Sequence, residues 1–157
     1  MRAFLCSLAL CIGCAVNPAA ADSAPWPAVP SRTVLQTPYG TLSVLSNEYI
    51  YESRLTFEGK LVEPRISGII NITYVYKIAD SQAVLIAVST GSKTCEITYY
   101  WIRIDSKGYQ VSEPFGSCSS EIRVDTEGAQ LVLSTPSIDG ADKIDTWVYD
   151  GHTVRRR

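Results

Sequence analysis

The sequence predicts an all-β protein, a single antiparallel β-sandwich or small barrel built from hairpins and braced by one disulfide. Short runs of β-branched and aromatic residues follow one another through residues 33–154, with turn residues between them. No amphipathic helix pattern is present in that region. Two cysteines, Cys95 and Cys118, flank the densest β-forming run, and the chain of 157 residues suits one domain.

The first 21 residues have the pattern of a secretory signal peptide. Arg2 supplies a positive start, residues 3–16 are apolar, and small residues precede a cleavage expected after Ala21. Lipoprotein processing at Cys14 is the alternative, and the alanine pattern favours the first route. We therefore expect a periplasmic or secreted protein with no transmembrane segment after processing.

The two ends of the mature chain differ in composition from the rest. Residues 22–32 form a Pro-rich N-terminal arm, in which Trp26 stands between prolines and is a candidate anchor to the domain. Residues 155–157 are three arginines and predict a solvated basic tail. The formal net charge is −2 and the charges are dispersed, so the composition does not favour a nucleic-acid partner.

The expected strands begin at residue 33 and take up most of the single β domain, residues 33–154. The first half contains runs at 33–36, 41–46, 48–51, 54–57 and 60–62, with turn signals at 37–40 and at Glu58-Gly59. Residues 69–79 alternate, which predicts one half-buried strand with Ile72, Tyr74, Tyr76 and Ile78 on the same face. Residues 83–90 are apolar on both faces, as in a central strand.

Hairpins continue through the second half. The run at 97–104 and the return strand from 109 flank the turn at 105–108. Two more pairs are expected at 122–124 with 130–134 and at 143–149 with 152–154. Their turns place an acidic residue close before glycine, which suits the left-handed backbone of hairpin turns.

Cys95 and Cys118 are the two cysteines left after removal of the leader, and an intrachain disulfide is the expected state in an oxidising compartment. The cross-link would close a loop of about 24 residues and stabilise the fold by roughly 3 kcal/mol in the chain-entropy model. A redox or metal-binding pair is the less favoured interpretation, because no C-x-x-C motif is present and the single histidine, His152, is distant in sequence.

Catalytic signatures are sparse. His152 lies in a predicted turn and is interpreted as an exposed turn residue, with general-base chemistry as the alternative. The best carboxylate pair is Glu96 and Glu121, since both are close in sequence to the cysteines and a disulfide would bring their segments together. We predict no catalytic residue, no metal site and no cofactor.

Aromatic residues are frequent in the predicted strands. Tyr74, Tyr76, Tyr99 and Trp101 are the candidate ligand-binding residues, because aromatic side chains on one sheet face stack on sugar rings or anchor a protein partner. The alternative is that tyrosine and tryptophan are present because they favour strands.

Residues 80–154 also carry a set of short motifs. These are Val84-Leu85-Ile86, Cys95, the aromatic strand after it, Phe115–Ser119 and Tyr149-Asp150-Gly151. This set resembles small β-rich secreted or periplasmic proteins of Gram-negative bacteria. The resemblance implies a fold and a compartment and carries no catalytic residue.

Together these patterns predict a non-catalytic binding protein of the cell envelope. Its partner is expected to be a protein or a glycan, as for an inhibitor or an immunity-type protein. The alternative is a small envelope hydrolase that acts on glycan with Glu96 and Glu121.

Overall fold

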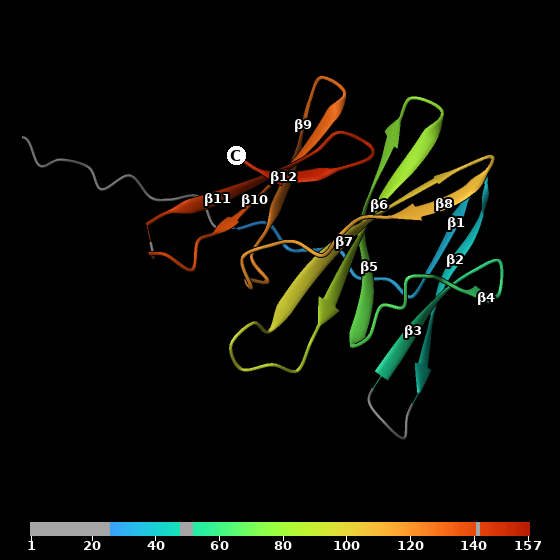
Figure 1. Cartoon of the computed structure of the whole chain (residues 1–157), viewed down its shortest axis with the longest axis horizontal. Coiled ribbons are helices and arrows are strands. Elements are labelled where there is room, and N and C mark those ends of the chain that lie inside the picture. The colour runs from blue at the N-terminus through green and yellow to red at the C-terminus, as the bar shows by residue number, and fades with distance from the viewer. Residues whose placement is uncertain (1–25, 48–51, 141) are drawn as a thin grey trace, which may run out of the picture.

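The computed structural model describes residues 26–47, 52–140 and 142–157 (Figure 1). The predicted signal peptide at 1–21, its Cys14 alternative and the predicted strand at 48–51 lie outside these residues. Within them the regular structure is β, and no helix is long and apolar enough to span a membrane.

Twelve strands are present in the described part of the chain. They are β1 (Val34–Thr37), β2 (Gly40–Asn47), β3 (Glu52–Phe57), β4 (Lys60–Leu61), β5 (Ile69–Ile78), β6 (Ser81–Ser89), β7 (Ile97–Asp105), β8 (Gly108–Val111), β9 (Arg123–Glu127), β10 (Gln130–Pro136), β11 (Ile144–Tyr149) and β12 (Val154–Arg156).

The strands form three antiparallel sheets of four strands each. We call β1-β2-β3-β4 the N-sheet, β5-β6-β7-β8 the central sheet and β12-β11-β10-β9 the C-sheet, in the order of their hydrogen-bonded neighbours. Figure 1 shows the central sheet between the other two. The all-β prediction is confirmed, and the arrangement is sandwich-like with a sheet on each side of the central one.

Strand β6 explains why three layers form. It pairs with β5 on one edge and β7 on the other, as the apolar run at 83–90 predicts. Val84 and Ile86 face the core shared with the N-sheet, while Ala83 and Leu85 face the core shared with the C-sheet. All four side chains are fully buried. A strand that is apolar on both faces needs a cover on each side, because successive side chains point in opposite directions.

The two cores differ in chemistry. The N-sheet core is aliphatic and includes Leu42 and Leu55 against Ile102 of β7. The C-sheet core combines aliphatic with aromatic side chains and includes Trp101, whose ring stacks on Tyr149 with centroids 5.3 Å apart and an interplanar angle of 9°. Aromatic pairs bury a large area and add their own attraction, so stacked rings strengthen the contact between the C-sheet and the central sheet.

Strand β5 does not keep its even-numbered residues on one face, as the alternating pattern predicts. Its register against β6 shifts by one residue between Ile72 and Val75, which is a β-bulge. Ile72 and Val75 both contact the N-sheet core, whereas Tyr74 and Tyr76 contact the C-sheet core. One extra residue reverses the alternation, and the even-numbered positions are thereby divided between two cores.

Backbone pairing with a sheet occurs near both ends of the described chain. Arg32, the last residue of the N-terminal arm, exchanges two backbone hydrogen bonds of 3.0 Å with Ile72 at the edge of β5. Residues 155–157, predicted to be a solvated tail, instead continue the C-sheet, since β12 extends to Arg156. Arg157 donates from its backbone N to Thr146 and contacts Glu127 at 2.9 Å, so carboxylates hold the basic end in place.

Candidate functional site

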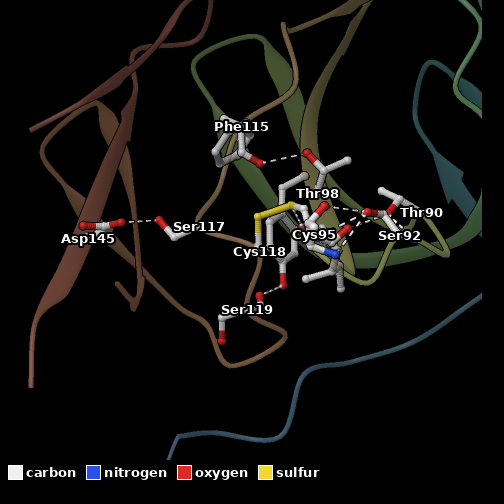
Figure 2. Close-up of a disulfide and its surroundings, with 12 residues drawn as sticks. Thr90, Ser92, Cys95, Thr98, Phe115, Ser117, Cys118, Ser119 and Asp145 are labelled. Atoms are coloured by element: carbon white, nitrogen blue, oxygen red, sulfur yellow. Dashed lines mark hydrogen bonds between the residues drawn. A yellow bond between two sulfur atoms is a disulfide. The ribbon is translucent and has the colours of Figure 1, made fainter. Parts of the chain in front are cut away.

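The predicted disulfide is present between Cys95 and Cys118, with an S–S distance of 2.06 Å and Cα atoms 4.7 Å apart. Figure 2 shows it joining the loop before β7 to the segment after β8. Phe115 exchanges backbone hydrogen bonds of 2.9 and 3.0 Å with Tyr99, which aligns that segment along β7 just before the cross-link. The loop containing Cys95 is therefore pinned to the segment that leads into the C-sheet.

A depression lies beside this cross-link. It has a volume of about 500 Å³ and is lined by Lys93, Thr94, Glu96, Ser117–Glu121, Pro136, Ser137 and Ile138. We call it the disulfide depression. Glu96 and Glu121 both line it, in agreement with the expectation that the cross-link draws their segments together. Both glutamates are exposed, and Ile138 is 72% exposed at the same place.

Buried polar side chains lie beneath the disulfide depression. Ser117 is 5% exposed and donates its hydroxyl hydrogen to Asp145, which is 6% exposed (Figure 2). Arg156 contacts the other carboxylate oxygen of Asp145. The indole Nε1 of Trp147 lies 3.5 Å from the Ser117 hydroxyl. The carboxylate of Asp145, in β11, is therefore bound by Ser117, which precedes Cys118, and by Arg156, which lies in β12.

The environment of Asp145 keeps it ionised. The hydrogen bond from Ser117, followed by the hydrogen bond from Arg156, lowers the pKa of Asp145 against the opposing effect of burial. A buried carboxylate with a charged partner and hydrogen bonds is compatible with a stable interior. This network fixes the position of Ser117 in the wall of the depression.

Sequence reasoning missed Ser117, Asp145 and Arg156. A signal was available for one of them, because Asp145, Trp147 and Tyr149 alternate along β11, and a strand places such residues on one face. An acidic residue on the same strand face as the partly buried Trp147 and the buried Tyr149 needs a polar or charged partner. That partner comes from the segment after β8, which no local pattern connects with β11.

Thr135 is an additional buried polar residue in this region. It pairs with Asp145 across β10 and β11 and is fully buried. Among the described residues its hydroxyl has no hydrogen-bond partner. Such a hydroxyl destabilises the folded state, because its hydrogen bonds to water are lost without replacement.

The four aromatic candidates do not form one exposed face. Tyr99 and Trp101 are each 1% exposed and belong to the core, so they offer no surface for stacking on a ligand. Burial raises the pKa of Tyr99, and its hydroxyl donates to the Ser119 carbonyl at 2.8 Å. Tyr99 thus supports the wall of the disulfide depression from inside. Tyr74 and Tyr76 are partly exposed and stack at 6.3 Å.

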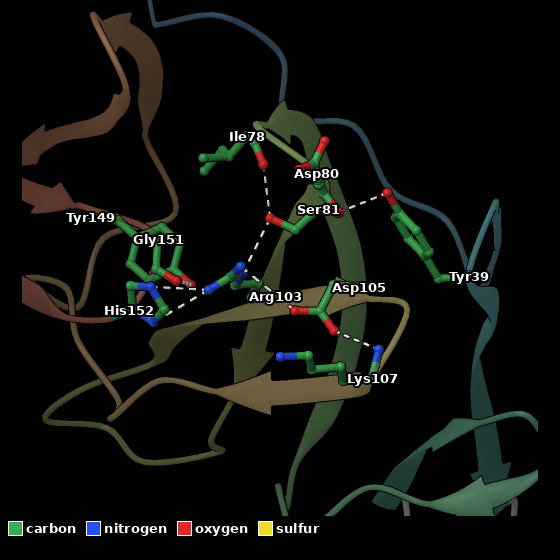
Figure 3. A network of polar contacts seen from close by, with 10 residues as sticks. All are labelled: Tyr39, Ile78, Asp80, Ser81, Arg103, Asp105, Lys107, Tyr149, Gly151 and His152. Atoms are coloured by element: carbon green, nitrogen blue, oxygen red, sulfur yellow. Dashed lines mark hydrogen bonds and ion pairs between the residues drawn. The ribbon is translucent and has the colours of Figure 1, made fainter.

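The single histidine belongs to a different polar network, drawn in Figure 3. His152 is exposed, and its ring nitrogens lie 3.0 and 3.3 Å from Nη1 of Arg103. Arg103 also donates to Ser81 and lies 3.6 Å from Asp105. Asp150 accepts a hydrogen bond from the backbone N of His152, not from its ring. The contacts of His152 therefore do not assemble a Ser-His-Asp triad, and they join the β11–β12 turn to the central sheet.

Among the described residues, no group of three or more His, Cys, Asp or Glu side chains is placed to hold a metal ion. The two cysteines are committed to the disulfide. Comparison of the chain with protein-family models, with curated proteins and with solved structures finds no match.

Proposed function

We propose that this chain is a non-catalytic binding protein of the cell envelope, periplasmic or secreted, that binds a protein partner at the disulfide depression. The observation that carries the proposal is the construction of that depression. An exposed rim with carboxylates and an apolar side chain lies over a base fixed by a disulfide and by the buried Ser117–Asp145 hydrogen bond, with Arg156 paired to the same carboxylate. A rigid base lowers the ordering cost of binding.

The rim indicates the chemistry of the partner. Two carboxylates, Glu96 and Glu121, against one amine, that of Lys93, suit a partner with basic side chains. Ile138, at 72% exposed, suits an apolar residue next to them. A surface that combines an apolar side chain with charged neighbours has the composition of a protein–protein interface, which joins an apolar core to a polar rim. We therefore expect a partner loop that carries lysine or arginine together with an apolar residue. An inhibitor or an immunity-type protein would use such a surface.

The test is capture of partners from envelope extract and culture supernatant by the tagged chain and by two matched variants. The rim variant is Glu121→Lys with Ile138→Ser. The control is Glu63→Lys with Leu61→Ser, which makes equivalent changes at and just after β4, where Leu61 is 48% exposed. We expect the wild-type chain and the control to retain one protein in stoichiometric amount, and the rim variant to lose it. Equal capture by all three chains, or capture of no protein, would refute the proposal.

A second candidate is the glycan hydrolase that uses Glu96 and Glu121, and it is favoured by their shared position in one depression. Against it, glycosidases keep their general acid protonated by burial, and both of these side chains are exposed. Release of reducing ends from cell-wall glycan by the wild-type chain, abolished by Glu96→Gln and Glu121→Gln, would establish this activity. Absence of release by the wild-type chain eliminates it.

A further inference from the structure

The N-terminal arm contacts two sheets at separated points, and Figure 1 shows it in blue passing from the C-sheet to β1. The Trp26 ring lies over the guanidinium of Arg123 in β9, with 5.7 Å between its centroid and Cζ. Near the other end, Ser31 donates to the side chain of Asn71 at 2.8 Å, and Arg32 pairs with Ile72 of β5. Between them, Val29 packs against the C-sheet core. We call Asn71, Ile72, Arg123 and the core surface under Val29 the arm seat.

The contacts at the arm seat suit extended segments in general. Two are backbone hydrogen bonds at Ile72, which any residue other than proline can supply in full. One is a side-chain hydrogen bond from Ser31 to Asn71, one is a cation–π contact, and one is apolar packing of a single side chain. The described arm residues are exposed or partly exposed, and none is buried. A segment held in this way is attached weakly compared with a strand of the domain.

Aromatic side chains lie next to the arm seat. Tyr76 donates its hydroxyl hydrogen to the carbonyl of Val124, the residue after Arg123. Tyr74 stacks on Tyr76, and both rings retain exposed surface. Aromatic side chains beside an extended docking site are the usual recognition elements for proline-rich segments. The prolines of the arm reduce the entropy lost on docking, because they hold the chain extended beforehand.

We propose that the arm seat is a binding site for an extended, proline-rich segment of a protein partner that carries an aromatic residue, and that the chain's own arm occupies this site as a competitor. The proposal rests on residues of β5 and β9 and is separate from the disulfide depression. A tethered arm acts at an effective concentration of about 1 mM. A free peptide is therefore expected to bind the wild-type chain weakly, and to bind more tightly once the arm is loosened.

Competition is tested by fluorescence anisotropy with a labelled, acetylated peptide of residues 25–32, PWPAVPSR, and the full chain purified after secretion. The loosened variant is Trp26→Ala with Val29→Ser. We expect it to bind the peptide about tenfold more tightly than the wild type. Adding Arg123→Gln to that variant should remove most of the gain, and a peptide with alanine in place of tryptophan should bind weakly to all chains.

A purely structural role for the arm predicts a different result. In that case the loosened variant melts at a lower temperature and shows no gain in peptide affinity, and this outcome overturns the proposal. Retention of the gain in the Arg123→Gln background overturns it as well. If the double variant does not fold, Trp26→Leu alone removes only the contact with Arg123, and the expected gain is about threefold.

Discussion

Replacement of Asp145 by asparagine is expected to lower the free energy of unfolding at pH 7 by about 2 kcal/mol. Asp145 is 6% exposed and accepts charge-assisted hydrogen bonds from Ser117 and Arg156. Hydrogen bonds to charged groups contribute about 1.5–3 kcal/mol each, and an amide keeps weaker versions of them. The loss is smaller than for a fully buried ion pair, because Arg156 is 49% exposed and regains water when its partner is neutral.

The effect of Asp145 depends on pH with a definite sign. Its pKa is lowered in the folded protein, chiefly by the hydrogen bond from Ser117. A depressed pKa contributes stability above the unfolded-state value of about 3.9, and the contribution is lost as the pH falls through the folded-state value. The difference between wild type and variant should therefore shrink below about pH 4. Asp150, whose pKa is lowered to about 2 by backbone hydrogen bonds from Thr153 and His152, titrates in both proteins and cancels in the comparison.

The assay is urea unfolding followed by tryptophan fluorescence at pH 7, 5, 4 and 3, which brackets the unfolded-state carboxylate pKa of about 3.9. The matched control is Asp139→Asn, since Asp139 contacts the same Arg156 at 3.4 Å with a side chain that is 61% exposed. A surface pair of this kind contributes less than about 1 kcal/mol. The reasoning is refuted if Asp145→Asn unfolds like the control at pH 7, or if its deficit stays constant down to pH 3.

Three further predictions concern stability. Serine at both Cys95 and Cys118 should lower the free energy of unfolding by about 3 kcal/mol, as measured by urea unfolding under non-reducing conditions, because the unfolded chain regains the entropy of a loop of about 24 residues. Thr135→Val should raise it by about 1 kcal/mol, since an unpartnered buried hydroxyl is replaced by a methyl group of similar shape, and a lower melting temperature would contradict this. Trp101→Ala should cost about 4 kcal/mol and Tyr74→Ala clearly less, because Trp101 is 1% exposed and Tyr74 is partly exposed; equal losses would contradict the assignment of Trp101 to the core.

The strands were predictable where local chemistry decides the structure. Glu58-Gly59 forms a hairpin turn with φ angles of 52° and 75°, the left-handed backbone that such turns require. The central position of β6 also follows from sequence, because a strand with apolar residues on both faces must be covered twice. The disulfide followed from the cysteine count, because two cysteines allow a single intrachain pairing.

The candidate site was predictable only in part. Glu96 and Glu121 meet in one depression as expected, because a short distance along the chain links each to a cysteine of the cross-link. Tyr99 and Trp101 were candidates for a surface and lie in the core. Their residue types suit both positions equally, and a second sheet packed over β7 decides between them.

By itself the sequence determined the all-β class, the hairpin turns and the cross-link, since these depend on residues near one another or on a count of cysteines. Tertiary structure alone decided the division into three sheets and the bulge at which the even-numbered side chains of β5 change from one core to the other. It also decided that the basic C-terminal residues pair with β11 as part of β12. It also brought Ser117 to Asp145, 28 residues away along the chain. Such contacts form because buried charge must find a partner and apolar faces must be covered, wherever along the chain the complementary residues lie.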